Sequence, residues 1–133
     1  MHEYADAPGL LVIDDEPAIL DLLRMVGTDA GLRVWTARRG DEGVELHRRH
    51  RGAISLVLCD VRMPGLDGPA TVAWLRQSAP DVRFCFMTGG SGGHTAESLI
   101  SLGALRLFDK PFDMANLGRH LYEMAVAGRA AAA

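Results

Sequence analysis

Short apolar runs alternate along this chain with longer stretches whose apolar residues repeat at helical spacing. The run over 54–58 is apolar almost throughout, which is typical of a central parallel strand covered on both faces. The stretch over 16–30 places Ile19, Leu23 and Val26 on one face of a helix. Strands are predicted near 10–14, 33–36, 54–60, 82–88 and 105–108. Helices are predicted near 16–30, 40–51, 67–78, 95–102 and 113–127.

This alternation predicts an α/β fold with a doubly wound, five-stranded parallel sheet and five helices. Crossovers between parallel strands are right-handed, which restricts the possible topologies. The expected strand order is 2-1-3-4-5, the flavodoxin-like arrangement, with its switch point between the first and third strands. Ligands bind at the carboxyl ends of the strands in such sheets.

Polar residues that can carry chemistry stand where four of the predicted strands end. Asp14 and Asp15 follow the first strand, Asp60 ends the third, and Thr88 ends the fourth. Lys110, which follows the fifth strand, is the only lysine among the 14 lysine and arginine residues. Because parallel strands share one carboxyl edge, the predicted order places the first two acids directly beside Asp60.

Three carboxylates at one sheet edge predict a cation site and a nucleophile. Crowded carboxylates resist ionising together, so at least one pKa should rise unless a cation is present. Mg²⁺ suits such a site because it uses one or two carboxylates and leaves room for phosphate oxygens. A free carboxylate beside the ion can attack a phosphoryl group and form an aspartyl phosphate. The Thr88 hydroxyl and the Lys110 ammonium can bind the phosphoryl oxygens.

The composition indicates one globular domain with a substantial core. The chain has 133 residues, 48% of them hydrophobic, and a net charge of −3. This acidic balance argues against general attraction to nucleic acid or membranes. Cys59 and Cys85 fall inside apolar runs and are interpreted as core residues in a reducing compartment. No signal peptide or transmembrane-length run is seen, so a cytoplasmic protein is expected.

The expected domain boundaries follow from where the pattern begins and ends. Residues 1–8 are interpreted as an N-terminal extension and residues 9–127 as the domain. The alanine-rich segment 128–133 is interpreted as a tail or the remnant of a linker.

Four motifs, in order, resemble those of the receiver domains of two-component response regulators. LLVIDDEPAILDLLR resembles their opening strand and helix, and CDVRMPGLDG resembles their phosphoacceptor strand and following loop. MTGG and FDKPF resemble their hydroxyl and lysine motifs. The resemblance covers about residues 9–126 and is of the type seen in the chemotaxis receivers, which have this strand order.

The resemblance implies a phosphoacceptor module and assigns its metal site. Asp60 would receive a phosphoryl group from a phosphohistidine of a partner histidine kinase or phosphotransfer protein. Mg²⁺ or Mn²⁺ would be bound by Asp15, by Asp60 and by the backbone carbonyl of Arg62, with Asp14 assisting through water.

The resemblance also assigns the residues that respond to the phosphoryl group. Thr88 and Lys110 would bind it and switch the conformation of the domain. The peptide bond before Pro111 would be cis. Arg62 and Gly90 occupy the positions that tune the slow self-dephosphorylation of the family.

Two features depart from the family pattern. The switch position three residues before the lysine, usually aromatic, holds Leu107, and the aromatic residue follows it as Phe108. Because neighbouring strand residues face opposite sides of a sheet, Phe108 is expected to pack in the core instead. The glycine-rich segment GGSGGH after Thr88 predicts a flexible entry to a short fourth helix.

The favoured hypothesis is a signalling module, not an enzyme, that controls an output partner through a face over residues 95–127. One alternative is an aspartyl-phosphate phosphatase or phosphotransferase. Such enzymes commonly carry a general acid two residues after the nucleophile, where Arg62 stands and cannot donate a proton in this way. The other alternative is a degenerate receiver that binds a partner without phosphorylation.

The basic run over 47–51 is interpreted as a solvated helix end, with a nucleic-acid patch as the weaker interpretation.

Overall fold

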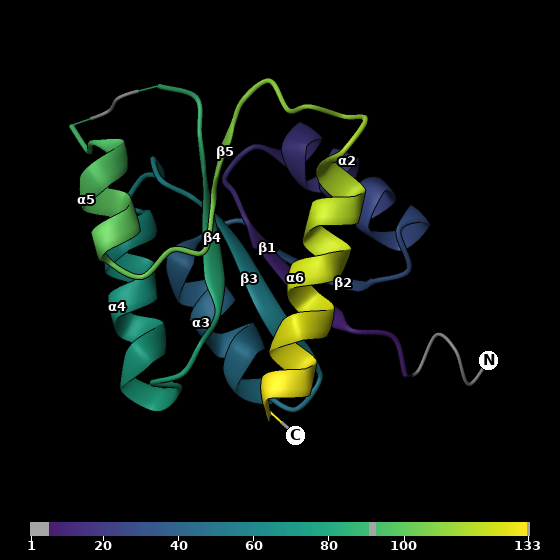
Figure 1. The fold of residues 1–133 in the computed structure, drawn as a ribbon. Helices are drawn as coiled ribbons and strands as arrows, with labels where there is room; N and C mark the ends of the chain where they lie inside the picture. The colour runs from purple at the N-terminus through teal and green to yellow at the C-terminus, as the bar shows by residue number, and fades with distance from the viewer. Residues whose placement is uncertain (1–5, 91–92, 133) are drawn as a thin grey trace.

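The computed structural model describes residues 6–90 and 93–132, in which five parallel strands alternate with five helices (Figure 1). The strands are β1 (Gly9–Ile13), β2 (Arg33–Ala37), β3 (Ile54–Asp60), β4 (Phe84–Thr88) and β5 (Leu107–Asp109). The helices are α2 (Pro17–Asp29), α3 (Gly40–Arg49), α4 (Gly68–Ser78), α5 (Ala96–Ser101) and α6 (Leu117–Ala132). The sheet order is β2-β1-β3-β4-β5, so the predicted fold class and strand order are confirmed.

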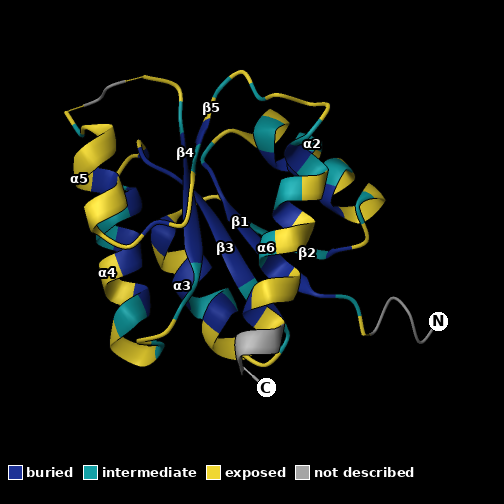
Figure 2. Cartoon of the chain, viewed as in Figure 1, coloured by how far each residue is buried: buried dark blue, intermediate teal, exposed yellow. Residues whose placement is uncertain are grey.

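The central strand β1 contributes to two separate cores, one on each face of the sheet. Leu10 and Val12 pack with buried residues of α2 and α6, whereas Leu11 and Ile13 pack with those of α3, α4 and α5. Figure 1 shows the two sets of helices on opposite faces. In Figure 2 the central strands β1, β3 and β4 are mainly buried, while the helices alternate buried and exposed residues. This two-sided burial explains why the central strands are apolar without alternation.

The strand register brings the carboxyl ends of the central strands to one edge. Ile13 pairs with Cys59, and Cys59 pairs with Phe86. Thr88 pairs with Asp109 on the outer strand. Residues that follow these pairs therefore lie next to each other, although they are far apart along the chain.

The last helix begins and ends later than predicted. The sequence pattern placed it at 113–127, but α6 begins at Leu117 and runs to Ala132. The segment before it is a turn in which the Asn116 and Leu117 N–H groups donate to the Asp113 carbonyl. The Asn116 side chain also donates to the Asp113 carboxylate, at 2.8 Å. These local bonds hold the turn outside the helix, which the 3.6-residue periodicity alone does not reveal.

Two strands also begin later than predicted. β4 starts at Phe84, because the Val82 N–H donates to the Ala79 carbonyl and closes a turn after α4. β5 starts at Leu107, although the Leu105 N–H still donates to the Phe84 carbonyl.

The basic run over 47–51 is only partly a solvated helix end. Arg48 and Arg49 are exposed and form ion pairs with Glu45 at 2.6 and 3.1 Å. His47, by contrast, is only 4% exposed, so its assignment to a solvated face was wrong. The reason is its position three residues after buried Val44, on the face of α3 that packs onto the sheet.

The flanking segments are only partly described. Residues 1–5 of the expected extension and residue 133 of the expected tail lie outside the described residues, so this division stays a prediction. Within the expected tail, α6 continues, and a Cβ on Gly128 would lie 2.6 Å from the Ser55 carbonyl oxygen. This part of the chain is therefore packed helix.

The glycine-rich segment after β4 is also partly described, because residues 91–92 lie outside the described residues. The helix after it is short, as predicted: α5 has six residues. Thr95 caps it by accepting a hydrogen bond from the Ser98 N–H at 3.0 Å.

Cys59 and Cys85 are free and buried, as expected for core residues. Within residues 6–90 and 93–132, no helix is long and apolar enough to cross a bilayer.

Candidate functional site

Three aspartates meet at the carboxyl edge of the sheet. Asp14 and Asp15 follow β1, and Asp60 ends the neighbouring strand β3. One carboxylate oxygen from each lies within 4.8 Å of the other two. Asp14 is fully buried, Asp60 is 5% exposed and Asp15 is half-buried. The structure therefore brings the three predicted acids together in a cluster that opens to solvent mainly at Asp15.

Backbone hydrogen bonds hold Asp14 in place. Its N–H donates to the Ala37 carbonyl at 3.1 Å, which continues the pairing of β1 with β2. Its carboxylate accepts from the Glu16 N–H at 2.9 Å, just before α2 begins at Pro17. The acid that ends the strand thus also shapes the entry to the first helix.

Lys110 reaches this cluster from the far edge of the sheet. Its backbone N–H donates to the Thr88 carbonyl at 2.9 Å, and its peptide bond to Pro111 is cis, the geometry that the resemblance implied. Its Nζ atom lies 2.8 Å from Asp14 Oδ2 and 3.5 Å from Asp60 Oδ1. It also lies 3.6 Å from the exposed Glu16 carboxylate. One ammonium therefore partly balances two buried carboxylates.

The buried acids hold their protons more strongly than free aspartates do. Burial, reinforced by the charge of Asp14, raises the pKa of Asp60 from 3.8 to about 6. Burial also raises the pKa of Asp14, against the lowering effect of its hydrogen bond from Lys110. The predicted rise in pKa is confirmed, and for Asp60 desolvation is its first cause and the like charge of Asp14 its second.

Thr88 lies at the end of β4, beside β3, but its hydroxyl turns into its own loop. It donates to the Gly90 carbonyl at 2.6 Å and accepts from the Gly90 N–H at 3.3 Å. Within the part of the chain that the structure describes, it forms no hydrogen bond with the three acids. The Thr88 hydroxyl, which was predicted to bind a phosphoryl group, therefore lies at the same edge of the sheet as the acids but is hydrogen-bonded to Gly90.

The two predicted tuning positions, Arg62 and Gly90, are both exposed. Arg62 is exposed and lines a hollow with Met63, Pro64 and Asp67. A Cβ on Gly90 would meet nothing within 4 Å.

Leu107 and Phe108 face opposite sides of the sheet. Leu107 is partly buried against the core beneath α3, α4 and α5. Phe108 is 8% exposed in the core beneath α2 and α6, with the Arg106 guanidinium 5.3 Å from its ring centroid. The prediction that Phe108 packs in the core is confirmed, and it does not take over the position of Leu107.

Two further residues shape the site: His94, for which the sequence indicated only an exposed loop position near the site, and Gly68, which the sequence did not single out. His94 Nε2 lies 3.2 Å from Asp67 Oδ2, which links the loop after β4 to the loop after β3. A Cβ on Gly68 would lie 2.6 Å from the Asp60 carbonyl oxygen. The start of α4 thus lies against the backbone of β3. Because this contact involves backbone atoms, no pattern of side chains in the sequence predicts it.

Comparison with known proteins gives consistent matches. A family model described as the response regulator receiver domain matches residues 10–122. The sensor kinase CckA of Brucella abortus (strain 2308) is 32% identical over 119 residues, covering 86% of this chain and 12% of the kinase. The transcriptional regulatory protein ZraR of Escherichia coli (strain K12) is 34% identical over 116 residues, covering 87% and 25%. The chain thus spans a quarter or less of these curated relatives.

Solved structures share the fold over nearly their whole length. A response regulator receiver domain protein from Clostridium thermocellum superposes with a TM-score of 0.79 at 25% identity, covering 91% of this chain and 93% of that one. The chemotaxis protein CheY4 of Vibrio cholerae superposes with a TM-score of 0.79 at 23% identity, covering 89% and 98%. At 23% identity the second likeness concerns the fold alone.

Proposed function

Because this chain belongs to the response regulator receiver domain family of two-component systems, we propose that it accepts a phosphoryl group on Asp60. The donor would be a phosphohistidine on a partner histidine kinase or phosphotransfer protein, in the cytoplasm. One observation carries the proposal: the Asp60 carboxylate is buried between two other aspartates and the ammonium of Lys110.

The donor set fits a divalent cation such as Mg²⁺ or Mn²⁺. Three carboxylate oxygens lie within 4.8 Å of one another, and one ammonium cannot neutralise all three charges. Hard cations prefer such oxygen ligands. Asp15 and Asp60 would bind the ion directly, with the backbone carbonyl of Arg62, and Asp14 would assist through water. When bound, the ion would neutralise negative charge on the phosphoryl oxygens.

In the proposed transfer, a carboxylate oxygen of Asp60 attacks the phosphorus atom. A new O–P bond forms as the P–N bond to the donor histidine breaks, and the imidazole leaves with the electron pair of that bond. Lys110 Nζ, already 3.5 Å from Asp60, would bind a phosphoryl oxygen. Such transfer depends mainly on positioning and on charge neutralisation.

Thr88 supplies a physical basis for a two-state response. Its hydroxyl now donates to the Gly90 carbonyl at 2.6 Å, so binding a phosphoryl oxygen requires that bond to break. Breaking it frees the loop that leads to α5. Phosphorylation would thereby shift an equilibrium between two arrangements of the domain. Leu107, which is partly buried on the strand beside β4, would change its packing against the core in that transition.

The proposed output face lies over α5, β5 and α6. Large apolar residues are exposed on α5 and in the turn between α5 and β5: Ile100, Leu102 and Leu105. Exposed apolar side chains at one face suit a protein partner or an effector domain, and we expect no direct contact of this domain with nucleic acid.

The test is phosphorylation by a small acyl-phosphate donor with Mg²⁺, followed by intact mass measurement. We expect one phosphoryl adduct that persists long enough to be measured and is absent in Asp60→Asn. A matched control is Glu97→Gln, which removes an exposed acid on α5 and should leave the adduct unchanged. Rapid multiple turnover of the donor would instead indicate an enzyme. Absence of any adduct in the folded protein, with small donors and with kinases, would overturn the proposal.

A further inference from the structure

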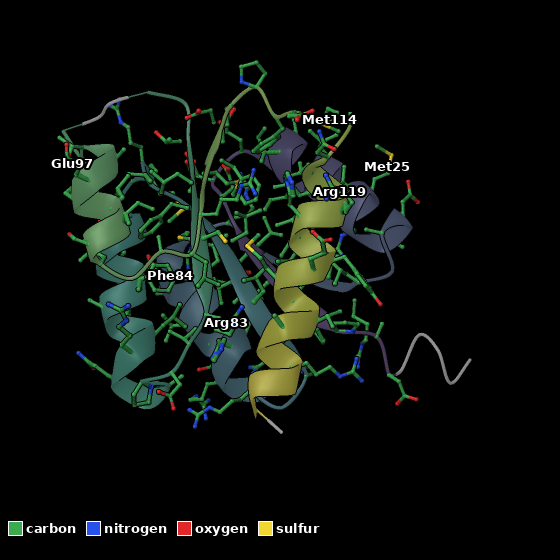
Figure 3. The ribbon with its side chains drawn as sticks, viewed as in Figure 1. Met25, Arg83, Phe84, Glu97, Met114 and Arg119 are labelled. Carbon is green, nitrogen blue, oxygen red and sulfur yellow. The ribbon has the colours of Figure 1, made fainter. Side chains whose placement is uncertain are left out.

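A second charged pocket lies at the opposite, amino-terminal edge of the sheet. It is a cavity of about 500 Å³ at the starts of β3 and β4, beneath the ends of α3 and α6. Its cationic lining residues are Arg33, Arg51, Arg83 and Arg129, and the buried His47 lies among them. Asp81 is the one acid among its lining residues. Figure 3 shows Arg83 at this lower edge, beside the C-terminal half of α6.

Three of these arginines have no acidic partner. Among residues 6–90 and 93–132, no carboxylate lies within 4.0 Å of the charged nitrogens of Arg51, Arg83 or Arg129. Arg48 and Arg49, on the neighbouring turn of α3, both pair with Glu45. The pocket therefore concentrates positive charge that the rest of this acidic protein does not balance, although its net charge is −3.

Two buried polar atoms in the lining lack a hydrogen-bond partner within the described residues. They are Nδ1 of His47, a residue only 4% exposed, and Nε of Arg83. Buried polar groups are nearly always satisfied, and each one left unpaired costs free energy. Arg83 Nη2 does donate to the Met124 carbonyl at 3.4 Å, which fixes the guanidinium against α6. These two unpaired atoms indicate that a ligand with a polar group binds in the pocket.

The remaining lining is apolar enough for an organic ligand. Ile54, Leu56, Val57 and Val82 contribute to the walls beside the arginines. A volume of about 500 Å³ lies within the usual range for sites that bind small molecules. Guanidinium groups recognise carboxylate and phosphate oxygens through paired N–H donors.

We infer that this amino-edge pocket binds a small organic anion, whose phosphate or carboxylate oxygens are held by Arg51, Arg83 and Arg129. The site is separate from the aspartate cluster, which lies at the other end of the same strands. It therefore does not depend on phosphorylation of Asp60.

The test uses inorganic pyrophosphate and citrate as probes, each titrated into the isotopically labelled protein without divalent cations and at constant ionic strength. We expect resonances of residues 52–57, of His47 and of the Arg83 side chain to shift, while those of residues 14–16 do not. If only pyrophosphate binds, the natural ligand is a phosphate, and if only citrate binds, it is a carboxylate.

Variants distinguish specific binding in the pocket from non-specific attraction of anions to arginines on the surface. The exposed Arg51 and Arg129 can be changed to Gln with little effect on folding, and we expect the double variant to weaken binding by about tenfold or more. Arg106→Gln removes an exposed arginine over Phe108, outside the pocket, and should change affinity by less than about twofold. Equal weakening by both, no shift at the pocket with either probe, or loss of binding in Asp60→Asn would overturn the inference.

Discussion

The Nζ atom of Lys110 lies 2.8 Å from Asp14 Oδ2, although the two residues are 96 positions apart in the chain. Asp14 is fully buried, and the Lys110 side chain is 15% exposed. In this state the lysine is bound more closely to Asp14 than to Asp60, which lies 3.5 Å away. The ion pair links the first strand to the loop after the last strand, across the whole site.

Replacing this lysine should destabilise the protein. Lys110→Met would leave the buried Asp14 carboxylate without its cation, and we expect the free energy of unfolding to fall by about 2 kcal/mol. Urea denaturation at neutral pH measures the change. Adding Asp14→Asn should recover part of the loss. Arg39→Met removes an exposed ion pair with Asp41 and should cost much less, because solvent screens exposed charges. Equal losses for the two single variants would contradict a special role of the buried pair.

Asp60→Asn should stabilise the protein without divalent cations. The folded-state pKa of Asp60, about 6, lies above the ordinary value of 3.8. The free energy of unfolding therefore falls as pH rises from about 4 through 6, because the unfolded state loses this proton first. At neutral pH the cost corresponds to at most roughly 3 kcal/mol, and the variant should regain about 1–3 kcal/mol. Below about pH 4 the carboxyl is protonated in both states, so the gain should vanish. A gain that persists unchanged at low pH would show that it has another origin.

Mg²⁺ should raise the thermal stability of the wild-type protein. An ion that binds only the native state adds about 1.4 kcal/mol at tenfold excess over its dissociation constant. Asp15→Asn removes the most exposed of the three carboxylates and should abolish most of this effect. Glu97→Gln, on α5, should preserve it. A Tm that rises equally with Mg²⁺ in all three proteins would argue against ion binding at the aspartates.

Gly68→Ala should disturb the acceptor strand. A Cβ at this position would lie 2.6 Å from the Asp60 carbonyl oxygen and 2.9 Å from the Val61 Cα, and both are backbone atoms that cannot yield without moving β3. We expect a loss of about 1–3 kcal/mol and slower phosphorylation of Asp60. Gly52→Ala is the matched control, because a Cβ there would meet nothing within 4 Å. Wild-type stability and phosphorylation rate in Gly68→Ala would contradict this tight contact.

Much of the fold could be predicted from local patterns. Apolar runs and helical repeats revealed every strand and helix, and the ends of strands marked Asp14, Asp60 and Lys110 as neighbours at one edge. Boundaries were less predictable, because the turn before α6 depends on hydrogen bonds to Asp113 that the periodicity does not carry. The burial of His47 was not predicted, because a histidine within a basic run suggested exposure to solvent. Its position in the helix nevertheless faces the sheet.

The sequence by itself determined the order of elements and which chemical groups stand at the strand ends, because hydrophobic periodicity is a local property of the chain. Only the tertiary structure decided how those groups pair: Lys110 with Asp14, Thr88 with Gly90, and Gly68 against the Asp60 backbone. It also decided that arginines from distant segments gather around Arg83 at the other edge. Such contacts depend on register and packing between segments far apart in the chain, which no local pattern encodes.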